Sequence, residues 1–199
     1  MTELSEKDRL VSFRRMQDGT CEDYLLLDQT ERECAQQLPD KILAALGQLG
    51  NALRGYQVSR LHHSLQTATR ALRDGADDEL IAAALIHDIG DELAPYSHQE
   101  IAAAILRPYV RAEVTWIVEH HALFQNYYYV HHLGGDRHAR ERYKDHPWYG
   151  ACRDFCANWD QNSFDPEYPT EPLSTFEPIV RQIFSRAPHD ARYTAPSGK

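Results

Sequence analysis

Hydrophobic residues recur at helical spacing along most of the chain. Between Ser59 and Arg73, for example, Leu61, Leu65 and Leu72 fall on one face of a helix. Capping residues and helix-stopping glycines mark where such segments begin and end. The pattern predicts helices over about 20–36, 39–49, 59–73, 77–89, 99–107, 112–124, 147–160 and 172–186. No segment shows the alternation of a half-buried strand, so we expect an all-α fold.

One of these segments has almost no polar face. The run from Leu80 to Ile89 is apolar all round, and either Asp77 or Asp78 caps its beginning. A helix of this kind is buried on every side, so we expect it at the centre of the fold. Gly90 is predicted to end it.

The length and composition predict one globular domain. The chain has 199 residues, of which 42% are hydrophobic and 26% are charged, which is enough apolar material for a core. We place the domain at residues 1–186 with its core at about 56–165. The stretch 127–149 is less regular, and residues 187–199, rich in Ala, Pro, Ser and Gly, are expected to form a flexible tail.

Charge and cysteine content narrow the function classes. The formal net charge is −9 and no basic block stands out, which argues against a nucleic-acid or anionic-membrane partner. The sequence has neither an apolar run of about 18 residues nor an N-terminal signal-peptide core, so we expect a cytoplasmic protein. The 4 cysteines are too few for a disulfide scaffold, and we interpret Cys152 and Cys156 as small core residues.

The 11 histidines suggest the chemistry. His87 and Asp88 are adjacent at the end of the most apolar helix, where desolvation is costly unless a partner compensates it. A divalent metal is one such partner, and a hydrogen-bonded His–Asp pair at a helix end is the alternative. Other segments carry the same residue types, and the candidate ligands are His63, His87, Asp88, His98, His121 and Asp160.

Three short sequences carry a family resemblance. They are Leu61 to Gln66 (LHHSLQ), Ala84 to Gly90 (ALIHDIG) and the pair Trp159–Asp160. They resemble the HD-domain superfamily, in particular its mixed-valent diiron oxygenases, which cleave organophosphonates and are related to myo-inositol oxygenase. The resemblance implies an HD-domain helical bundle with the metal site at its centre.

The resemblance also implies a ligand set and a cofactor. His63, His87, Asp88 and Asp160 would hold one iron, and Asp88, His98 and His121 the other, so that Asp88 bridges two irons in a mixed-valent Fe(II)/Fe(III) pair. O2 would be the co-substrate. Ligand types alone do not distinguish iron from manganese or nickel, so iron is implied by the resemblance.

The implied reaction is oxidative C–P cleavage of a small 1-hydroxyphosphonate. The expected substrate is (R)-1-hydroxy-2-(trimethylammonio)ethylphosphonate, and the products are glycine betaine and phosphate. Asp91 stands where related sites often carry a basic residue, and a carboxylate there favours a cationic substrate. Aromatic faces can bind a quaternary ammonium group. The candidates are Tyr128 and Trp148, together with Phe124, Tyr127, Tyr129, Tyr149 and Trp159.

The other substrate contacts are hypotheses from residue type. Donors for the anionic end of the substrate are predicted among Arg60, His62, His131, His132 and Arg137. Related oxygenases use a tyrosine to occupy iron before the substrate arrives, and the candidates for this role here are Tyr24 and Tyr56.

Two other functions are compatible with the same residues. A metal-dependent HD-type phosphohydrolase or phosphodiesterase would use the same ligands without O2. A catalytically silent HD sensing module is the third possibility, and the full set of ligand residues argues against it. The predicted partner is a small-molecule organophosphonate.

Overall fold

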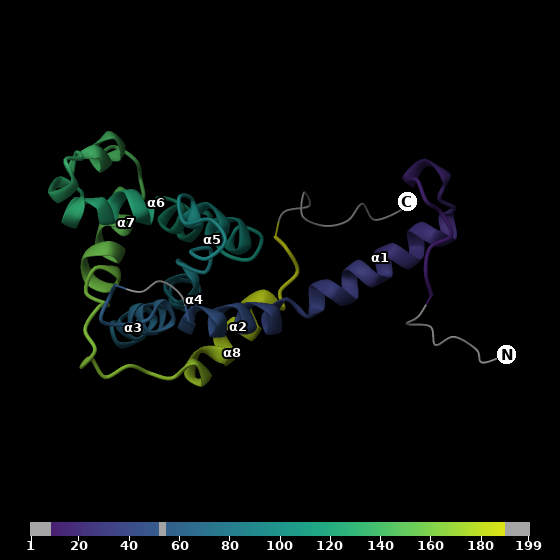
Figure 1. Cartoon of the computed structure of the whole chain (residues 1–199), viewed down its shortest axis with the longest axis horizontal. Helices are drawn as coiled ribbons and strands as arrows, with labels where there is room; N and C mark the ends of the chain where they lie inside the picture. Colours follow the sequence, from purple (N-terminus) through teal and green to yellow (C-terminus); the bar gives the residue numbers. More distant parts are fainter. Residues whose placement is uncertain (1–8, 52–54, 190–199) are drawn as a thin grey trace.

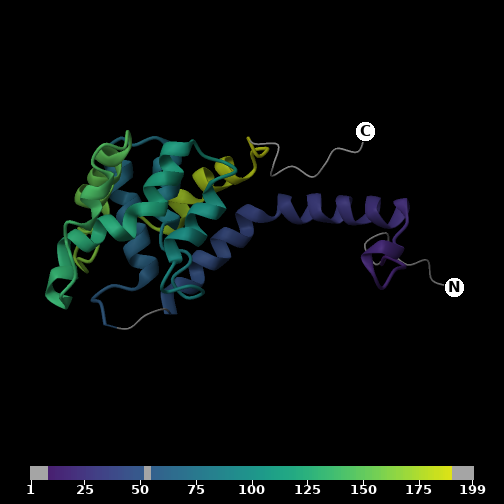
Figure 2. The ribbon, with the colours of Figure 1, turned by 90° about the horizontal axis from the view of Figure 1, so that it is seen from above.

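The protein is an all-helical bundle from which one helix projects. The computed structural model describes residues 9–51 and 55–189, in which there are α-helices and short 3-10 or π segments but no strand. The α-helices are α1 (Cys21–Gln36), α2 (Leu38–Gln48), α3 (Arg60–Arg73), α4 (Asp78–Ile86), α5 (His98–Leu106), α6 (Ala112–Tyr129), α7 (Tyr149–Phe155) and α8 (Leu173–Phe184). In Figures 1 and 2, α1 extends away from the bundle that the other helices form.

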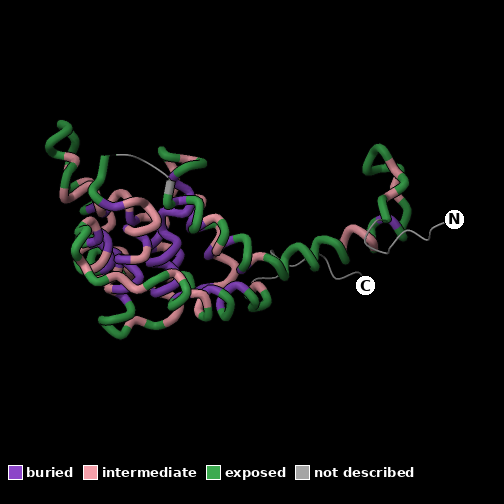
Figure 3. Tube along the Cα trace, turned by 60° about the horizontal axis from the view of Figure 1, so that its bottom comes forward, coloured by how far each residue is buried: buried purple, intermediate pink, exposed green. Residues whose placement is uncertain are grey.

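Helix α4 forms the centre of the bundle, as its apolar sequence predicts. It packs against α3, α6 and α8, and every residue from Ile81 to Asp91 is buried. Figure 3 shows the buried positions concentrated in the bundle, whereas α1 is mostly exposed. The only buried residue of α1 is Asp23, whose carboxylate accepts hydrogen bonds from Ser12 and Thr20.

Local capping explains how α3 and α4 are aligned. The side chain of Ser59 accepts a hydrogen bond from His62 N at the start of α3, and Asp77 caps α4 by accepting from Glu79 N and Leu80 N. Between them, Gly75 has a φ of +73°, the left-handed conformation that ends many helices and that glycine adopts without strain. The two helices therefore run side by side.

Several predicted boundaries need correction. Helix α4 ends at Ile86, so His87 to Gly90 form turns rather than the last helical residues. Helix α6 continues to Tyr129, and the irregular stretch begins after Tyr129 instead of at Tyr127. The predicted helix 147–160 consists of α7 followed by a π-helical segment, Cys156–Asp160.

The predicted flexible tail falls mainly on residues 190–199, which lie outside the described residues. Residues 187–189 of this tail are described, and there His189 N donates a hydrogen bond to Pro108 O of the bundle. In the described ranges, no helix is both long and apolar enough to span a lipid bilayer.

Candidate metal centre

The structure brings all six candidate ligands together in the middle of the bundle. His63 comes from α3, and His87 and Asp88 come from the turn after α4. His98 begins α5 and His121 lies within α6, while Asp160 ends the π-helical segment. Five of the six are buried, and His98 is partly buried. The π-helical segment, whose hydrogen bonds span one residue more than those of an α-helix, packs against α3, and there Asp160 Oδ1 lies 3.3 Å from His63 Nε2.

The first half of the centre consists of His63, His87 and Asp160. The two histidine Nε2 atoms are 3.1 Å apart. Asp160 Oδ1 lies 3.3 Å from His63 Nε2 and 3.7 Å from His87 Nε2. These atoms are close enough together to share one metal ion.

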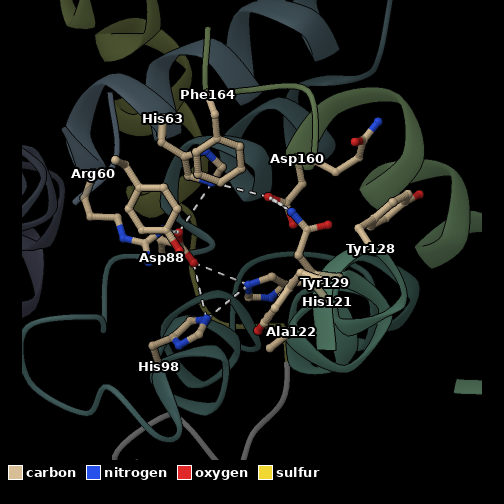
Figure 4. Close-up of a pocket in the computed structure, with 13 residues that line it drawn as sticks. Arg60, His63, Asp88, His98, His121, Ala122, Tyr128, Tyr129, Asp160 and Phe164 are labelled. Carbon is tan, nitrogen blue, oxygen red and sulfur yellow. Dashed lines mark hydrogen bonds and ion pairs between the residues drawn. The ribbon is translucent and has the colours of Figure 1, made fainter. Parts of the chain in front are cut away.

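The second half consists of His98 and His121. Their Nε2 atoms are 3.3 Å apart, and each faces Asp88 Oδ1, at 3.3 Å from His98 and 3.4 Å from His121. The other oxygen, Asp88 Oδ2, faces the first half, at 3.4 Å from His63 and 3.5 Å from His87. Each oxygen of Asp88 therefore faces a different pair of histidines, and Figure 4 shows Asp88 between His63 and the pair His98 and His121.

The outer nitrogens of the histidines fix which way the rings point. Three of the Nδ1 atoms lie at hydrogen-bond distance from backbone carbonyls: His63 from Ser163 O, His87 from Ala84 O and His121 from Val118 O. A carbonyl only accepts, so each of these Nδ1 atoms carries the hydrogen and donates. Each Nε2 atom is then left with a lone pair that faces inward, which is the arrangement of neutral histidine metal ligands.

The electrostatics of the cluster favour bound cations. Burial disfavours the ionised form of Asp88, but the facing histidines outweigh burial and hold the pKa of Asp88 well below its usual range. The pKa of Asp160 is likewise lowered, because His63 and His87 outweigh its burial. Burial lowers the pKa of His87 to about 4, so this imidazole is neutral and free to bind a metal at neutral pH.

The residues present fit a pair of metal ions. The Nε2 atoms of His63 and His87 lie 3.1 Å apart, and those of His98 and His121 lie 3.3 Å apart. Two nitrogen lone pairs repel each other at these distances unless a proton or a cation lies close by. Asp160 Oδ2 is buried and has no hydrogen-bond partner among the described residues. Imidazole and carboxylate ligands suit iron, manganese, zinc and related ions. A carboxylate such as Asp88 can bridge two ions, whereas each histidine nitrogen binds only one.

We expect metal binding to release protons. Burial opposes protonation of His63 and His121, but Asp160 and Asp88 outweigh it, so the pKa of each is raised above 6.5 in the metal-free protein. A metal must displace these protons, so its affinity is expected to fall as the pH falls through these pKa values and to rise above them. Calorimetric titrations near pH 7 in buffers of different ionisation enthalpy measure the protons released. A heat of binding independent of the buffer would contradict this expectation.

A cavity of about 390 Å³ opens onto the two halves of the centre. Besides five of the candidate ligands it is lined by Tyr56, Arg60, Ala122, Gln125, Tyr128, Tyr129, Gln161 and Phe164. Arg60 Nη1 donates to Asp88 Oδ2 at 3.2 Å, and the Arg60 guanidinium lies over the Tyr56 ring. The cavity thus combines one cation, several aromatic faces and the cluster of histidines and carboxylates (Figure 4).

Four of the predicted substrate or iron contacts line this cavity, namely Tyr56, Arg60, Tyr128 and Tyr129, and Asp91 does not. Asp91 is buried, with Oδ2 2.6 Å from Arg60 Nε and Oδ1 3.2 Å from His98 Nδ1. Its charge therefore faces Arg60 and His98 and not the cavity. Burial and neighbouring Asp88 raise the pKa of Asp91.

The other predicted contacts lie away from the cavity. Tyr24 is on the projecting helix α1, where its hydroxyl bonds Met16 O, so it cannot reach the centre in this structure. Trp148 packs beside Trp116 and His146.

The predicted anion-binding group is also dispersed. His62 lies at hydrogen-bond distance from Thr170, Arg137 stacks on the ring of Tyr127, and the rings of His131 and His132 pack on each other in a 3-10 segment, Val130–Leu133, that has no buried residue. None of these four lines the cavity, whereas Arg60, the fifth member of the predicted group, does. His131, His132 and Arg137 lie outside the α-helices, so no packed α-helix directs their side chains towards the cavity.

Sequence reasoning missed Gln125, Gln161 and Phe164 as lining residues. Gln125 lies one helical turn after His121, and this i, i+4 spacing on a recognised ligand helix is a signal that points it into the same cavity. Phe164 stacks on the ring of His63 with the centroids 4.4 Å apart. It comes from a turn after Asp160, where the sequence has no periodic pattern.

Comparison with known proteins agrees with this geometry. Residues 60–155 match the family described as "HD domain". The matched segment runs from the start of α3 to the end of α7. The match contains five of the six candidate ligands and ends before Asp160, which the fold adds to the cluster.

A curated relative carries an oxygenase name. It is the [1-hydroxy-2-(trimethylamino)ethyl]phosphonate dioxygenase (glycine-betaine-forming) of Leisingera caerulea, which is 31% identical over 84 residues, covering 37% of this chain and 43% of the relative. The match thus spans less than half of the relative's length. Together, the HD domain, this relative and the histidine–aspartate clusters support a metal-dependent HD enzyme.

Proposed function

We propose that the protein is a diiron oxygenase that cleaves the C–P bond of a small 1-hydroxyphosphonate bearing a trimethylammonium group. The observation that carries the proposal is the position of Asp88, whose two oxygens face separate histidine pairs at 3.3 to 3.5 Å. This arrangement suits two metal ions bridged by one carboxylate. The name of the curated relative supports the choice of substrate and of oxygen chemistry.

The proposed ligands are divided between the two ions. His63, His87 and Asp160 would hold one iron, His98 and His121 the other, and Asp88 would bridge them. When bound, the irons would supply the redox chemistry with O2 that side chains cannot provide. In the overall reaction the C–P bond breaks, the hydroxyl-bearing carbon becomes the carboxylate of glycine betaine, and the phosphonate leaves as inorganic phosphate, with O2 as the oxidant.

The cavity walls suit both ends of the proposed substrate. Arg60 has five N–H donors, of which Nε and Nη1 face Asp91 and Asp88, and the others are available for a phosphonate oxygen. Tyr56, Tyr128, Tyr129 and Phe164 offer aromatic faces to a quaternary ammonium group. Each well-placed ring contributes roughly 0.5–2 kcal/mol. This role of the aromatic wall replaces the one predicted for Asp91.

The proposal is tested by following product formation with and without O2. Iron-loaded protein is incubated with (R)-1-hydroxy-2-(trimethylammonio)ethylphosphonate, and inorganic phosphate and glycine betaine are measured. We expect equal amounts of both products in air and neither under argon. Phosphate release under argon would instead indicate an HD-type hydrolase, and the absence of release in both conditions would reject this substrate. The control is the metal-free protein in air.

A further inference from the structure

Besides Arg60, which donates to Asp88, two polar side chains outside the ligand set each touch one member of it, on opposite halves of the centre. Gln125 contacts Asp160, and Asp91 lies against His98. The other three candidate histidines are held by backbone carbonyls, as described above. Gln125 and Asp91 are therefore places where a side-chain substitution can alter how a ligand is held without removing the ligand itself.

Gln125 holds Asp160 from helix α6. Its Nε2 donates to Asp160 Oδ1 at 3.0 Å. An ionised carboxylate only accepts hydrogen bonds, so the NH2 end of the amide must face Asp160. Asp160 Oδ2 has no hydrogen-bond partner among the described residues. Gln125 thus holds Asp160 Oδ1, the oxygen that faces the two histidines, and so sets where this oxygen lies relative to a metal ion at His63 and His87.

Asp91 holds His98 from the turn after α4. Asp91 Oδ1 lies 3.2 Å from His98 Nδ1, while Asp91 Oδ2 lies 2.6 Å from Arg60 Nε. The other His98 nitrogen, Nε2, then faces Asp88 Oδ1 and His121 Nε2. The two groups are placed as in a carboxylate–histidine–metal arrangement, in which an outer carboxylate fixes the ring and raises its basicity, although the contact has ion-pair distance and not hydrogen-bond geometry.

The two contacts share no residue. Gln125 is hydrogen-bonded to Asp160 in the first half of the centre, whereas Asp91 is paired with Arg60 and with His98, a ligand of the second half. Contacts with no shared partner act almost independently on free energy. Arg60, which pairs with Asp91, also donates to Asp88 Oδ2, so any coupling between the two contacts passes through Arg60 and Asp88.

We propose that Gln125 and Asp91 are positioning residues that set the affinities of the two metal positions separately. Gln125 supports the position formed by His63, His87 and Asp160, and Asp91 supports the position formed by Asp88, His98 and His121. This inference rests on the proposed two-metal centre, but it concerns binding alone and not the reaction. Outer contacts of this kind contribute roughly 10–100-fold to metal affinity.

The test isolates each position in turn and uses Co²⁺ as the probe, because it suits the same ligands. The variant His98→Ala weakens the second position, and His63→Ala weakens the first. Gln125→Met keeps the volume of the side chain but removes its amide. Calorimetric titration with Co²⁺ is expected to show Gln125→Met weakening binding by roughly 10–100-fold in the His98→Ala background and leaving it unchanged in the His63→Ala background.

Asp91→Asn is expected to show the opposite dependence. An asparagine offers one acceptor oxygen where Arg60 and His98 are both donors, so one of them loses its partner. Co²⁺ binding should weaken in the His63→Ala background and be unchanged in the His98→Ala background. If Asp91→Asn does not fold, Asp91→Glu keeps the charge that pairs with Arg60 and displaces the carboxylate from His98 Nδ1, and the same measurement is made on it.

The matched control is Gln161→Met. Gln161 lines the same cavity, but its Nε2 bonds Ala157 O and Asn162 Oδ1 rather than a ligand. We expect it to leave both Co²⁺ affinities unchanged. Equal weakening of both positions by Gln125→Met or Asp91→Asn, or no weakening by either, would overturn the inference. Failure of the unsubstituted protein to bind two Co²⁺ ions would instead reject the metal centre on which the proposed function rests.

Discussion

Replacing Asp88 with asparagine is expected to abolish metal binding at both positions and activity with it. Asp88 contributes one oxygen to each half of the centre, and these oxygens lie 3.3 to 3.5 Å from four histidine nitrogens. Asparagine keeps the shape but has one acceptor oxygen and no charge. We therefore expect a loss of metal affinity beyond the roughly 10–100-fold that outer contacts contribute.

Thermal unfolding provides a second measurement of the same variant. A ligand that binds only the folded state stabilises it by about 2.7 kcal/mol when its concentration is 100 times Kd. Added Fe²⁺ or Co²⁺ should therefore raise the Tm of the unsubstituted protein and leave that of Asp88→Asn unchanged. Phosphate release by the variant should fall to the level of the metal-free protein.

The control is Asp23→Asn. Asp23 is also a buried carboxylate, but it accepts its hydrogen bonds from Ser12 and Thr20 at the start of α1, away from the cluster. This variant should keep its metal and its activity. If Asp88→Asn kept two bound ions, or if Asp23→Asn lost them, Asp88 would not be the bridging ligand.

The sequence predicts the centre of this fold better than its edges. The apolar run that becomes α4 has one explanation, burial on every side, and the structure agrees.

Where two histidines are adjacent, spacing alone does not show which of them faces the centre. The structure turns His63 and His121 inward, whereas His62 lies beside Thr170 and His120 stacks on Trp116.

Long-range partners explain most of what the sequence could not predict. The charge of Asp91 suggests an attraction for cations, but its partner is Arg60 on a different helix. The π-helical segment that ends at Asp160 is hard to recognise in the hydrophobic pattern, because a single wide turn shifts the phase of the pattern but leaves its period unchanged. The aromatic run Tyr127–Tyr129 has weak helical propensity and is helical here as the continuation of α6.

Gly90→Ala is expected to disturb the centre through the backbone. A Cβ atom on Gly90 would lie 2.8 Å from His98 O, 2.9 Å from Ile101 Cβ and 3.1 Å from His98 Cα. None of these atoms can rotate away as the end of a long side chain could, so the start of α5 must move. Overpacking of this kind costs typically 1–3 kcal/mol, which we expect as a loss in the free energy of unfolding in denaturant.

The displaced atoms belong to His98, so the same substitution should also weaken the second metal position. A matched control is Gly47→Ala in α2, where a Cβ would meet nothing within 4 Å. Alanine is favoured over glycine within a helix by up to about 1 kcal/mol, so the control should be neutral or stabilising. Unchanged stability and metal binding in Gly90→Ala would show that α5 accommodates the extra methyl group and that the close approach of Gly90 does not position His98.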